Sequence, residues 1–288
     1  MWGFNFPAVK VLYQQMTPAA VTLVRFVPMY LLLVLVCKLR GEVLRYGKDS
    51  WPVLWQGFVS LGIYLILFME GMKRTSAAEG AIILAAAPVL VAVFSVMAKY
   101  EKFTPGAIAG CSIAFLGTAI VIGSGGKGSH GTIEGNLMVF SSAVVWAYGA
   151  VLSKPLVNKY SPVQSLTLSM PAALVVLLPY GLMPVLEAPW TTLTPTSWWM
   201  LAHVTFGAGF IGFLGFYEGV KAKGPAAAMM YQFFVPILAA GFGYLLLDEK
   251  LHLWQAVGLC VVIVGVLVAS RARYQAAAIL ARAEAAAS

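Results

Sequence analysis

Long apolar segments follow one another along almost the whole 288-residue chain, and few charges interrupt them. Apolar residues make up 60% of the chain and charged residues only 10%, and the mean hydropathy is +0.85. A soluble domain carries about 25% charged residues, because its surface must be solvated. This composition excludes a soluble enzyme. It predicts a polytopic membrane protein, in which each helix needs about 20 apolar residues to cross the lipid core.

We expect ten membrane helices in an all-α fold. The first is too short to cross the membrane, because Lys10 and Gln14 follow closely on Met1. Either the native chain begins earlier or this helix enters the membrane only part-way. The ranges expected from the apolar segments are 2–14, 18–37, 52–70, 76–98, 104–122, 135–153, 163–186, 196–217, 225–247 and 251–270.

The basic residues predict how the chain is oriented in the membrane. Lysine and arginine total 19 against 11 acidic residues, which gives a formal charge of +8. In a chain this apolar, such an excess indicates basic cytoplasmic loops rather than nucleic-acid binding. If both termini are cytoplasmic, most lysines and arginines fall in loops on the inner side. We therefore expect a multi-pass protein of the cytoplasmic (inner) membrane with both termini in the cytoplasm.

Two halves of the chain repeat one another. Pro88 and Pro236 are 148 positions apart, and at the same offset the pattern F-x-E-G-x-K occurs at 68–73 and again at 216–221. Earlier in the chain, with an offset of 144, Trp2 pairs with Trp146. The expected division is a first five-helix repeat at 1–128, a second at 129–271, and a cytoplasmic tail at 272–288 that forms a frayed helix.

Because five is an odd number, the second repeat must enter the membrane from the opposite side, so the repeats are inverted. Many transporters use inverted repeats to build two alternately open faces around one site at the membrane midplane. We therefore expect a central cavity between the repeats. This symmetry favours a transporter over a receptor or a purely structural protein.

Several short motifs carry a family resemblance. They are W-G-x-N-F at 2–6, Pro18 with Arg25 in the second helix, T-S-A-A at 75–78, Pro88 in mid-helix, and an E-K pair before a G-x6-G helix in each half. In these motifs the chain resembles the drug/metabolite transporter superfamily, in the EamA-type branch of ten-helix exporters. Members of that branch usually begin with further apolar residues before the tryptophan, so the first helix here looks short by comparison.

The resemblance implies export of small molecules from the cytoplasm by alternating access, without covalent chemistry. Because the branch includes aromatic amino-acid exporters and the expected cavity is aromatic with few fixed charges, we favour aromatic and neutral amino acids, moving by facilitated diffusion. The alternatives are a drug or lipophilic-cation exporter and a proton-coupled antiporter. A membrane-embedded enzyme is the alternative from another class, and it would need clustered His, Asp or Glu within the membrane.

Polar and aromatic residues within the predicted helices are the candidate substrate ligands. Tyrosine and tryptophan rings can stack on an aromatic or cationic solute, and amide groups can orient its amine or carboxylate. Tyrosine and tryptophan are also common at membrane interfaces. The candidates are Asn5, Tyr64, Glu79, Trp146, Tyr148, Tyr231 and Gln232.

Three charged residues within predicted helices have competing interpretations. Glu79, in the first turn of the fourth helix, either binds a substrate amine or carries a coupling proton, or it is a capping carboxylate favoured by the helix dipole. Arg25 is expected to snorkel or to pair with backbone carbonyls, with carboxylate binding as the alternative. Glu70 stands beside Lys73, which indicates a local ion pair at a helix end.

Prolines and glycines mark the expected bends. Pro88 and Pro236 each remove a backbone donor, and carbonyls freed at membrane depth must be covered by protein or face a water-filled cavity. The fourth and ninth helices should therefore line the cavity. Together with Gly212 and Gly215 of the eighth helix, these prolines are the candidate hinges, and simple close packing is the alternative.

Small residues occupy one face of the fifth and tenth helices. Small faces let helices approach closely in lipid. These helices therefore either pack against other helices of the chain or form a dimer contact. Ten helices can enclose a cavity alone, so we expect a monomer whose partners are a small-molecule substrate and the lipid bilayer. The residues of these faces are Gly106, Gly110, Gly117, Gly258 and Gly265.

The chain carries no motif of a metal or nucleotide site. The three cysteines form no C-x-x-C, and the three histidines are far apart in the sequence. The segment 123–131 contains G-S-G-G-K-G, but it follows a membrane helix rather than a strand, which indicates a flexible linker. We therefore expect no metal, no cofactor and no nucleic-acid partner.

Overall fold

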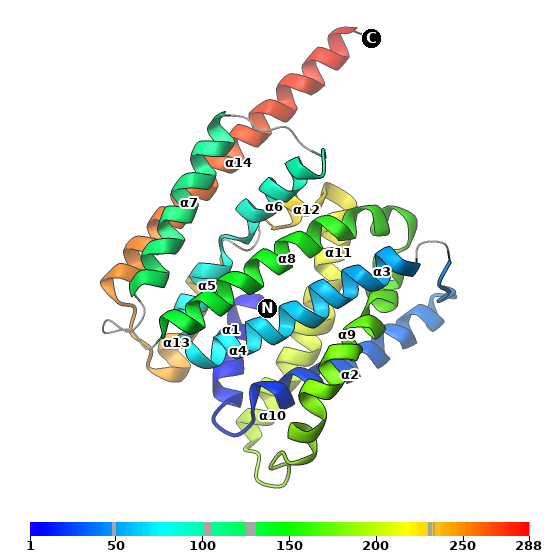
Figure 1. The fold of residues 1–288 in the computed structure, drawn as a ribbon, viewed down its shortest axis with the longest axis vertical. Helices are drawn as coiled ribbons and strands as arrows, with labels where there is room; N and C mark the ends of the chain where they lie inside the picture. Colours follow the sequence, from blue (N-terminus) through cyan, green and yellow to red (C-terminus); the bar gives the residue numbers. More distant parts are fainter. Residues whose placement is uncertain (48–49, 101–104, 125–130, 230–231, 233, 288) are drawn as a thin grey trace.

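The computed structural model describes residues 1–47, 50–100, 105–124, 131–229, 232 and 234–287. These residues form a bundle of helices, and no strand occurs among them (Figure 1). The all-α prediction is therefore confirmed. Nine helical segments of this described part are long and apolar enough to cross a membrane. The first helix has 11 residues, which at 1.5 Å per residue falls short of the lipid core, as expected.

The helices follow one another in the same order in the two halves. The first half contains α1 (Trp2–Leu12), α2 (Pro18–Leu39), α3 (Ser50–Gly57), η1 (Phe58–Ile63), α4 (Tyr64–Arg74), α5 (Ala77–Leu84), α6 (Ala87–Met97) and α7 (Pro105–Ser124). The second half contains α8 (Ile133–Lys159), α9 (Pro162–Leu186), α10 (Pro195–Ala202), η2 (His203–Ile211), α11 (Gly212–Lys223), α12 (Pro225–Met229), α13 (Phe234–Leu247) and α14 (Leu253–Ala287). Residues 272–287, the expected tail, continue α14 as a helix.

Hydroxyl side chains begin many of the long helices. Each accepts a hydrogen bond from a backbone N–H of the first turn, one of the donors that a helix start leaves without a partner. Ser161 and Gln164 complete a reciprocal capping box. Proline follows the cap in α2, α9 and α10, where its missing N–H costs nothing. The capping residues are Thr17, Ser76, Thr132, Ser161 and Thr194.

The connections place the helix ends at two ends of the bundle. At one end, Gln15 hydrogen-bonds Thr192, and Lys10 hydrogen-bonds the carbonyl of Thr75. We call this the Thr75 end. At the other end, Ser161 donates to the carboxylate of Glu42 at 2.7 Å. We call this the Glu42 end.

Irregular backbone occurs at matching places in the two halves. The segment expected to be the fourth helix is divided before Pro88: α5 ends at Leu84 and α6 begins at Ala87. Leu84 is four positions before Pro88, and in a continuous helix the proline ring would clash with its carbonyl. In the second half Pro236 is the third residue of α13, and Gln232, four positions earlier, has 3-10 rather than α-helical backbone. Two π-helical segments, η1 and η2, end at Ile63 and Ile211, which are 148 positions apart, as the prolines are.

Glycines let α7 and α14 pack backbone to backbone, and the two helices lie side by side at one edge of the bundle (Figure 1). A Cβ at Gly110 would lie 2.5 Å from the carbonyl oxygen of Gly265, and a Cβ at Gly265 would lie 2.7 Å from that of Gly110. In the same way, a Cβ at Gly117 would lie 2.9 Å from the carbonyl oxygen of Gly258, and a Cβ at Gly258 would lie 3.0 Å from that of Gly117. The glycine faces therefore pack within the chain, which removes the glycine argument for a dimer contact.

Helix contacts recur when the two halves are exchanged. Helix α1 packs on α13 as α8 packs on α6, and α2 contacts η2 as α9 contacts η1. The α2–α9 and α7–α14 pairs join equivalent helices. These contacts are consistent with two repeats related by pseudo-symmetry. The expected boundary at 128/129 lies outside the described residues and stays a prediction.

Replacing Gly110 with valine should destabilise the protein, because the new side chain would meet the backbone of α14. Overpacking of this kind costs about 1–3 kcal/mol. The matched control is Gly123→Val in the same helix, where a Cβ meets nothing within 4 Å. Thermal unfolding of the detergent-solubilised variants, followed by size-exclusion chromatography, measures the difference. Equal melting temperatures would contradict the α7–α14 packing.

Candidate functional site

A cavity lies where the two halves of the chain meet beside the irregular backbone. Helices α1, α2, α4 and α5 contribute to it from the first half, and α8, α11 and α13 from the second. As the prolines predict, residues just before each of them line it, Leu84 and Ala85 before Pro88 and Gln232 and Val235 before Pro236. The lining residues are Trp2, Asn5, Phe6, Arg25, Tyr64, Leu65, Phe68, Ala81, Leu84, Ala85, Trp146, Phe213, Gln232 and Val235.

Aromatic rings form one continuous wall of this cavity around Trp146. The ring centroid of Trp146 is 5.1 Å from that of Tyr64, 5.4 Å from that of Phe213 and 6.0 Å from that of Trp2. Phe216 lies behind it at 4.8 Å. Tilted and edge-on contacts at these distances are the favourable ones for aromatic pairs. The wall therefore presents both ring faces and ring edges to an occupant.

Four buried polar atoms in the cavity lining have no hydrogen-bond partner among the described residues. They are Asn5 Oδ1, Arg25 Nη1, Trp146 Nε1 and Gln232 Oε1. All four side chains are at most 6% exposed. An unpaired buried polar group costs about 1–3 kcal/mol, so such a concentration indicates a site that a ligand completes.

Other polar groups near the cavity are satisfied within the protein. The indole Nε1 of Trp2 donates to the carbonyl of Ala208 in η2 at 3.0 Å. Gln56 Nε2 lies 2.6 Å from the Tyr217 hydroxyl. Four further buried side-chain atoms without a partner, Gln56 Oε1 among them, lie outside the described lining, so half of the eight are in this one cavity.

The cavity is nearly closed in this conformation. The space that the centre of a water-sized sphere can occupy is about 30 Å³. That is room for about one water molecule, whereas sites for small organic ligands measure about 300–1,000 Å³. A larger solute can therefore enter only after the helices around the cavity move apart.

The structure separates the sequence-predicted site residues into two groups. Asn5, Tyr64, Trp146 and Gln232 all line the cavity. Tyr148 does not, because it is 38% exposed on the outside of α8, where its ring packs on Phe94.

Two other residues of that prediction do not contribute to the described lining. Glu79 is fully buried, but away from the lining residues. Tyr231 lies outside the described residues.

The sequence-based candidate list omitted several lining residues. Arg25 was expected to snorkel or to pair with carbonyls, but the structure places it in the cavity wall. Trp2 is the repeat mate of Trp146, and that pairing was a usable signal. Phe213 carries no comparable signal in an apolar helix.

Two of the candidate hinges differ in their surroundings. A Cβ at Gly212 would lie 2.4 Å from Trp2 Nε1, whereas a Cβ at Gly215 would meet nothing within 4 Å. Gly212 begins α11 where the π-helical segment ends, so its missing side chain makes room for the indole of Trp2. The hinge role of Gly212, Gly215, Pro88 and Pro236 stays a prediction.

Glu79 belongs to a buried polar cluster at the Thr75 end. Its Oε2 accepts a hydrogen bond from the Thr75 hydroxyl at 2.9 Å, and its Oε1 accepts one from Gln255 Nε2 at 3.0 Å. Asn136 contacts the Thr75 hydroxyl on the other side. The contacting atom of Asn136 is Oδ1, an acceptor, and because a hydroxyl has one proton, Thr75 can donate either to Glu79 or to Asn136 at one time. The cluster joins α5 to α8 and α14.

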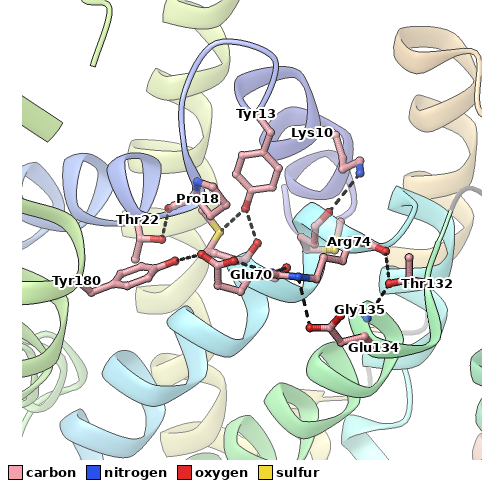
Figure 2. Close-up of polar contacts among 12 residues, drawn as sticks. Lys10, Tyr13, Pro18, Thr22, Glu70, Arg74, Thr132, Glu134, Gly135 and Tyr180 are labelled. Carbon is pink, nitrogen blue, oxygen red and sulfur yellow. Dashed lines mark hydrogen bonds and ion pairs between the residues drawn. The ribbon is translucent and has the colours of Figure 1, made fainter. Parts of the chain in front are cut away.

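A second polar cluster at the Thr75 end surrounds Glu70 and Arg74 (Figure 2). Arg74 Nη1 lies 2.6 Å from Glu70 Oε2, and the Tyr180 hydroxyl donates to Glu70 Oε1, also at 2.6 Å. The expected ion-pair partner of Glu70, Lys73, is thus replaced by Arg74, one turn away on the same helix. Thr132 N donates to the Arg74 carbonyl at 2.8 Å, which connects the start of α8.

Substituting alanine for Gly212 should displace the indole of Trp2 and weaken its bond to Ala208. We expect a loss of about 1–3 kcal/mol in stability, because the contact is far shorter than van der Waals distance. Gly215→Ala is the matched control three residues along, and alanine there should leave stability unchanged or raise it. Melting temperatures of the purified variants check this, and a tolerated Gly212→Ala would show that the close contact is unimportant.

Comparison with known proteins connects this cavity to transport. The model of the EamA-like transporter family matches residues 1–123 and 133–271. The transporter YyaM of Bacillus subtilis is 26% identical over 84% of this chain and 79% of its own length. A probable terminal-alkyne amino-acid exporter of Streptantibioticus cattleyicolor is 24% identical over 94% and 90%. The aromatic amino acid exporter YddG of Ancylobacter novellus is 28% identical over 40% and 41%.

A solved protein structure matches the fold with a TM-score of 0.70 over 95% of both chains, at 18% sequence identity. That match supports the architecture alone. The family model covers both halves of the bundle, including the helices that build the cavity. The chain is therefore a multi-pass membrane protein that belongs to the EamA-like transporter family.

Proposed function

We propose that this transporter exports neutral and aromatic amino acids from the cytoplasm by alternating access. The observation that carries the proposal is the cavity itself, with an aromatic wall and four unpartnered polar atoms. Aromatic rings suit apolar and aromatic side chains, and a few convergent polar atoms suit the polar groups of a small solute. Distant relatives named as amino-acid exporters support the same substrate class.

The charges around the cavity disfavour a lipophilic cation as substrate. Among the described lining residues, the one charged side chain is Arg25, and no carboxylate occurs. Glu79, the expected counter-charge for a cation, is bonded to Thr75 and Gln255 outside the lining. A cation would therefore meet a buried positive charge, which is unfavourable in a medium of low dielectric constant.

Alternating access requires the closed cavity to open towards one end at a time. The polar clusters of Glu79 and Glu70 link helices at the Thr75 end. The interruption at Ala85, the 3-10 backbone at Gln232 and the two π-helical segments are places where helices can bend. In the proposed cycle the Glu42 end faces the cytoplasm, because most lysines and arginines lie in the connections of that end. Both termini are then cytoplasmic.

The proposed transport is facilitated, and one chain is sufficient. No carboxylate among the described lining residues is positioned to carry a coupling proton in contact with substrate. Residues of a single chain build the whole described lining. Movement of substrate then follows its own gradient across the cytoplasmic membrane.

Counterflow in proteoliposomes without an ion gradient tests the proposal. Labelled phenylalanine, tryptophan and threonine should exchange into liposomes loaded with unlabelled phenylalanine, whereas glutamate should not. Empty liposomes are the control. No exchange of any amino acid would refute the proposed substrate class. Exchange that needs an imposed pH gradient would refute facilitated transport alone.

A matched pair of variants on α8 tests the location of the site. Trp146→Leu removes the centre of the aromatic wall and should weaken apparent phenylalanine affinity about 10-fold, equivalent to about 1.4 kcal/mol. Tyr148→Leu, two residues away on the outer face, should leave affinity unchanged. Concentration dependence of counterflow gives both values, and equal effects of the two substitutions would place the substrate elsewhere.

Changing Glu79 to glutamine should affect stability and not substrate choice. The amide keeps one acceptor, but its NH2 group replaces the second acceptor, so the Thr75 hydroxyl can no longer donate there and the remaining bond loses its charged acceptor. The expected cost is about 1–3 kcal/mol. Melting temperature and the order of preference within the amino-acid panel are the two readouts. A changed preference with an unchanged melting temperature would revive Glu79 as a substrate ligand.

A further inference from the structure

Arg25 is a buried charge for which the described part of the chain provides no counter-charge. The side chain is 4% exposed, within α2, and its Nη1 has no hydrogen-bond partner. The ion pairs of the described residues involve Arg74, and none involves Arg25. An unpaired ionised group inside a membrane protein is costly, and such residues usually mark a ligand or ion pathway.

The guanidinium group is held against both the cavity and η2. Arg25 lines the cavity, and its Nη2 would lie 3.9 Å from a Cβ built on Gly209. Helix α2 packs on η2, and its neighbour α1 is tied to η2 by the bond from Trp2 to Ala208. Arg25 therefore does not reach the membrane surface as a snorkelling residue would.

The four unpartnered atoms of the cavity divide by chemistry into two donors and two acceptors. Arginine and the indole N–H can only donate, so Arg25 Nη1 and Trp146 Nε1 suit an anionic oxygen. Asn5 Oδ1 and Gln232 Oε1 are acceptors and suit the N–H groups of an ammonium. Half of the eight unpartnered buried side-chain atoms in the described structure are in this one lining. The two donors and the two acceptors therefore face the same cavity.

The positions of these residues keep the two pairs on different helices. Arg25 and Trp146 belong to α2 and α8, and Tyr64 of α4 lines the cavity with both, with its ring 5.1 Å from that of Trp146. Asn5 is on α1, which packs on α13, and Gln232 precedes α13 by two residues. The donors are thus grouped around Tyr64, and the acceptors around the α1–α13 contact.

We infer that Arg25 and Trp146 bind the carboxylate of the substrate, while Asn5 and Gln232 bind its ammonium group. This inference rests on the proposed function and specifies it: the cavity selects solutes by a free carboxylate first and an amino group second. A zwitterionic amino acid satisfies all four atoms. A carboxylate without an amine leaves Asn5 and Gln232 unpaired. An amine without a carboxylate leaves Arg25 unpaired and adds a second positive charge beside it.

Competition with substrate analogues tests this order in the unaltered protein. Labelled phenylalanine counterflow should be inhibited by unlabelled phenylalanine, about 10-fold more weakly by 3-phenylpropionate, and about 100-fold more weakly by phenylalaninamide. Equal inhibition by phenylalanine and phenylalaninamide would overturn the carboxylate site while leaving amino-acid transport intact. Absence of phenylalanine exchange would overturn the proposed function, and this inference with it.

Variants of the two donors and the two acceptors test which residues bind the carboxylate and which bind the ammonium group. Arg25→Gln should weaken phenylalanine about 10- to 100-fold and phenylalaninamide hardly at all, so that the preference between them is lost. Arg25→Lys keeps the charge and should retain part of the preference. Asn5→Ala and Gln232→Leu should instead reduce the preference for phenylalanine over 3-phenylpropionate. A purely structural role of Arg25 would lower activity with every compound equally and leave the ratios unchanged.

Stability measurements show whether an Arg25 variant loses transport because it no longer binds substrate or because it no longer folds. Melting temperatures of purified Arg25→Gln and Arg25→Lys, with and without phenylalanine, separate loss of fold from loss of binding. Phenylalanine and 3-phenylpropionate should raise the melting temperature of the unaltered protein, whereas phenylalaninamide should not. If phenylalaninamide stabilises the protein as strongly as phenylalanine does, the assignment of Arg25 to the carboxylate is wrong.

Discussion

Backbone hydrogen bonding in a medium without water is the constraint that organises this molecule. Each unpaired backbone group in lipid costs several kcal/mol, so irregular backbone is tolerated only where protein or a cavity covers it. The helix that contains Pro88 is interrupted at Ala85 and Ala86, both at most 3% exposed. Its counterpart departs from α-helical geometry at Gln232, which is 4% exposed. Both places border the same cavity, so the weakest points of the helices and the candidate site coincide.

The same constraint explains why unpartnered polar atoms are informative here. The clusters at the Thr75 end satisfy most of their groups: both oxygens of Glu79 have donors, and so do those of Glu70. In the cavity, by contrast, four side chains each have a buried polar atom without a partner among the described residues: Asn5, Arg25, Trp146 and Gln232. The fully buried carboxylate of Glu79 shows that the fold can provide hydrogen-bond donors for a buried charge. Half of the unpartnered buried side-chain atoms of the described residues are thus concentrated in the cavity, where a solute can supply the missing partners.

The fold follows from the sequence more completely than the site does. Apolar segments must match the lipid thickness, which is why the ten helices were predictable, and the proline pair predicted the interruptions. Within the site, Trp146 and Tyr148 are two positions apart and therefore about 200° apart around a helix, so both cannot face one cavity. The environment of Glu79 was beyond reach because Gln255, one of its two partners, is 176 positions away. The role of Arg25 was ambiguous because the sequence gives its position along the helix but not the side of the helix on which its side chain lies. That side decides whether the residue snorkels to the membrane surface or lines the cavity.

The repeats are symmetric in architecture but not in the contacts that close their ends. At the repeat offset of 148, Glu79 corresponds to Ala227 and Gln255 to Ala107, so neither residue of that hydrogen bond has a polar equivalent at the Glu42 end. The Glu79 cluster therefore ties helices at the Thr75 end by bonds that the repeat does not reproduce at the Glu42 end, where Ser161 and Glu42 form a different one. A difference of about 1.4 kcal/mol between two conformations shifts their ratio 10-fold. In the proposed cycle the balance between these two sets of contacts decides which end is closed at rest, and an exporter must open towards the cytoplasm to load its substrate.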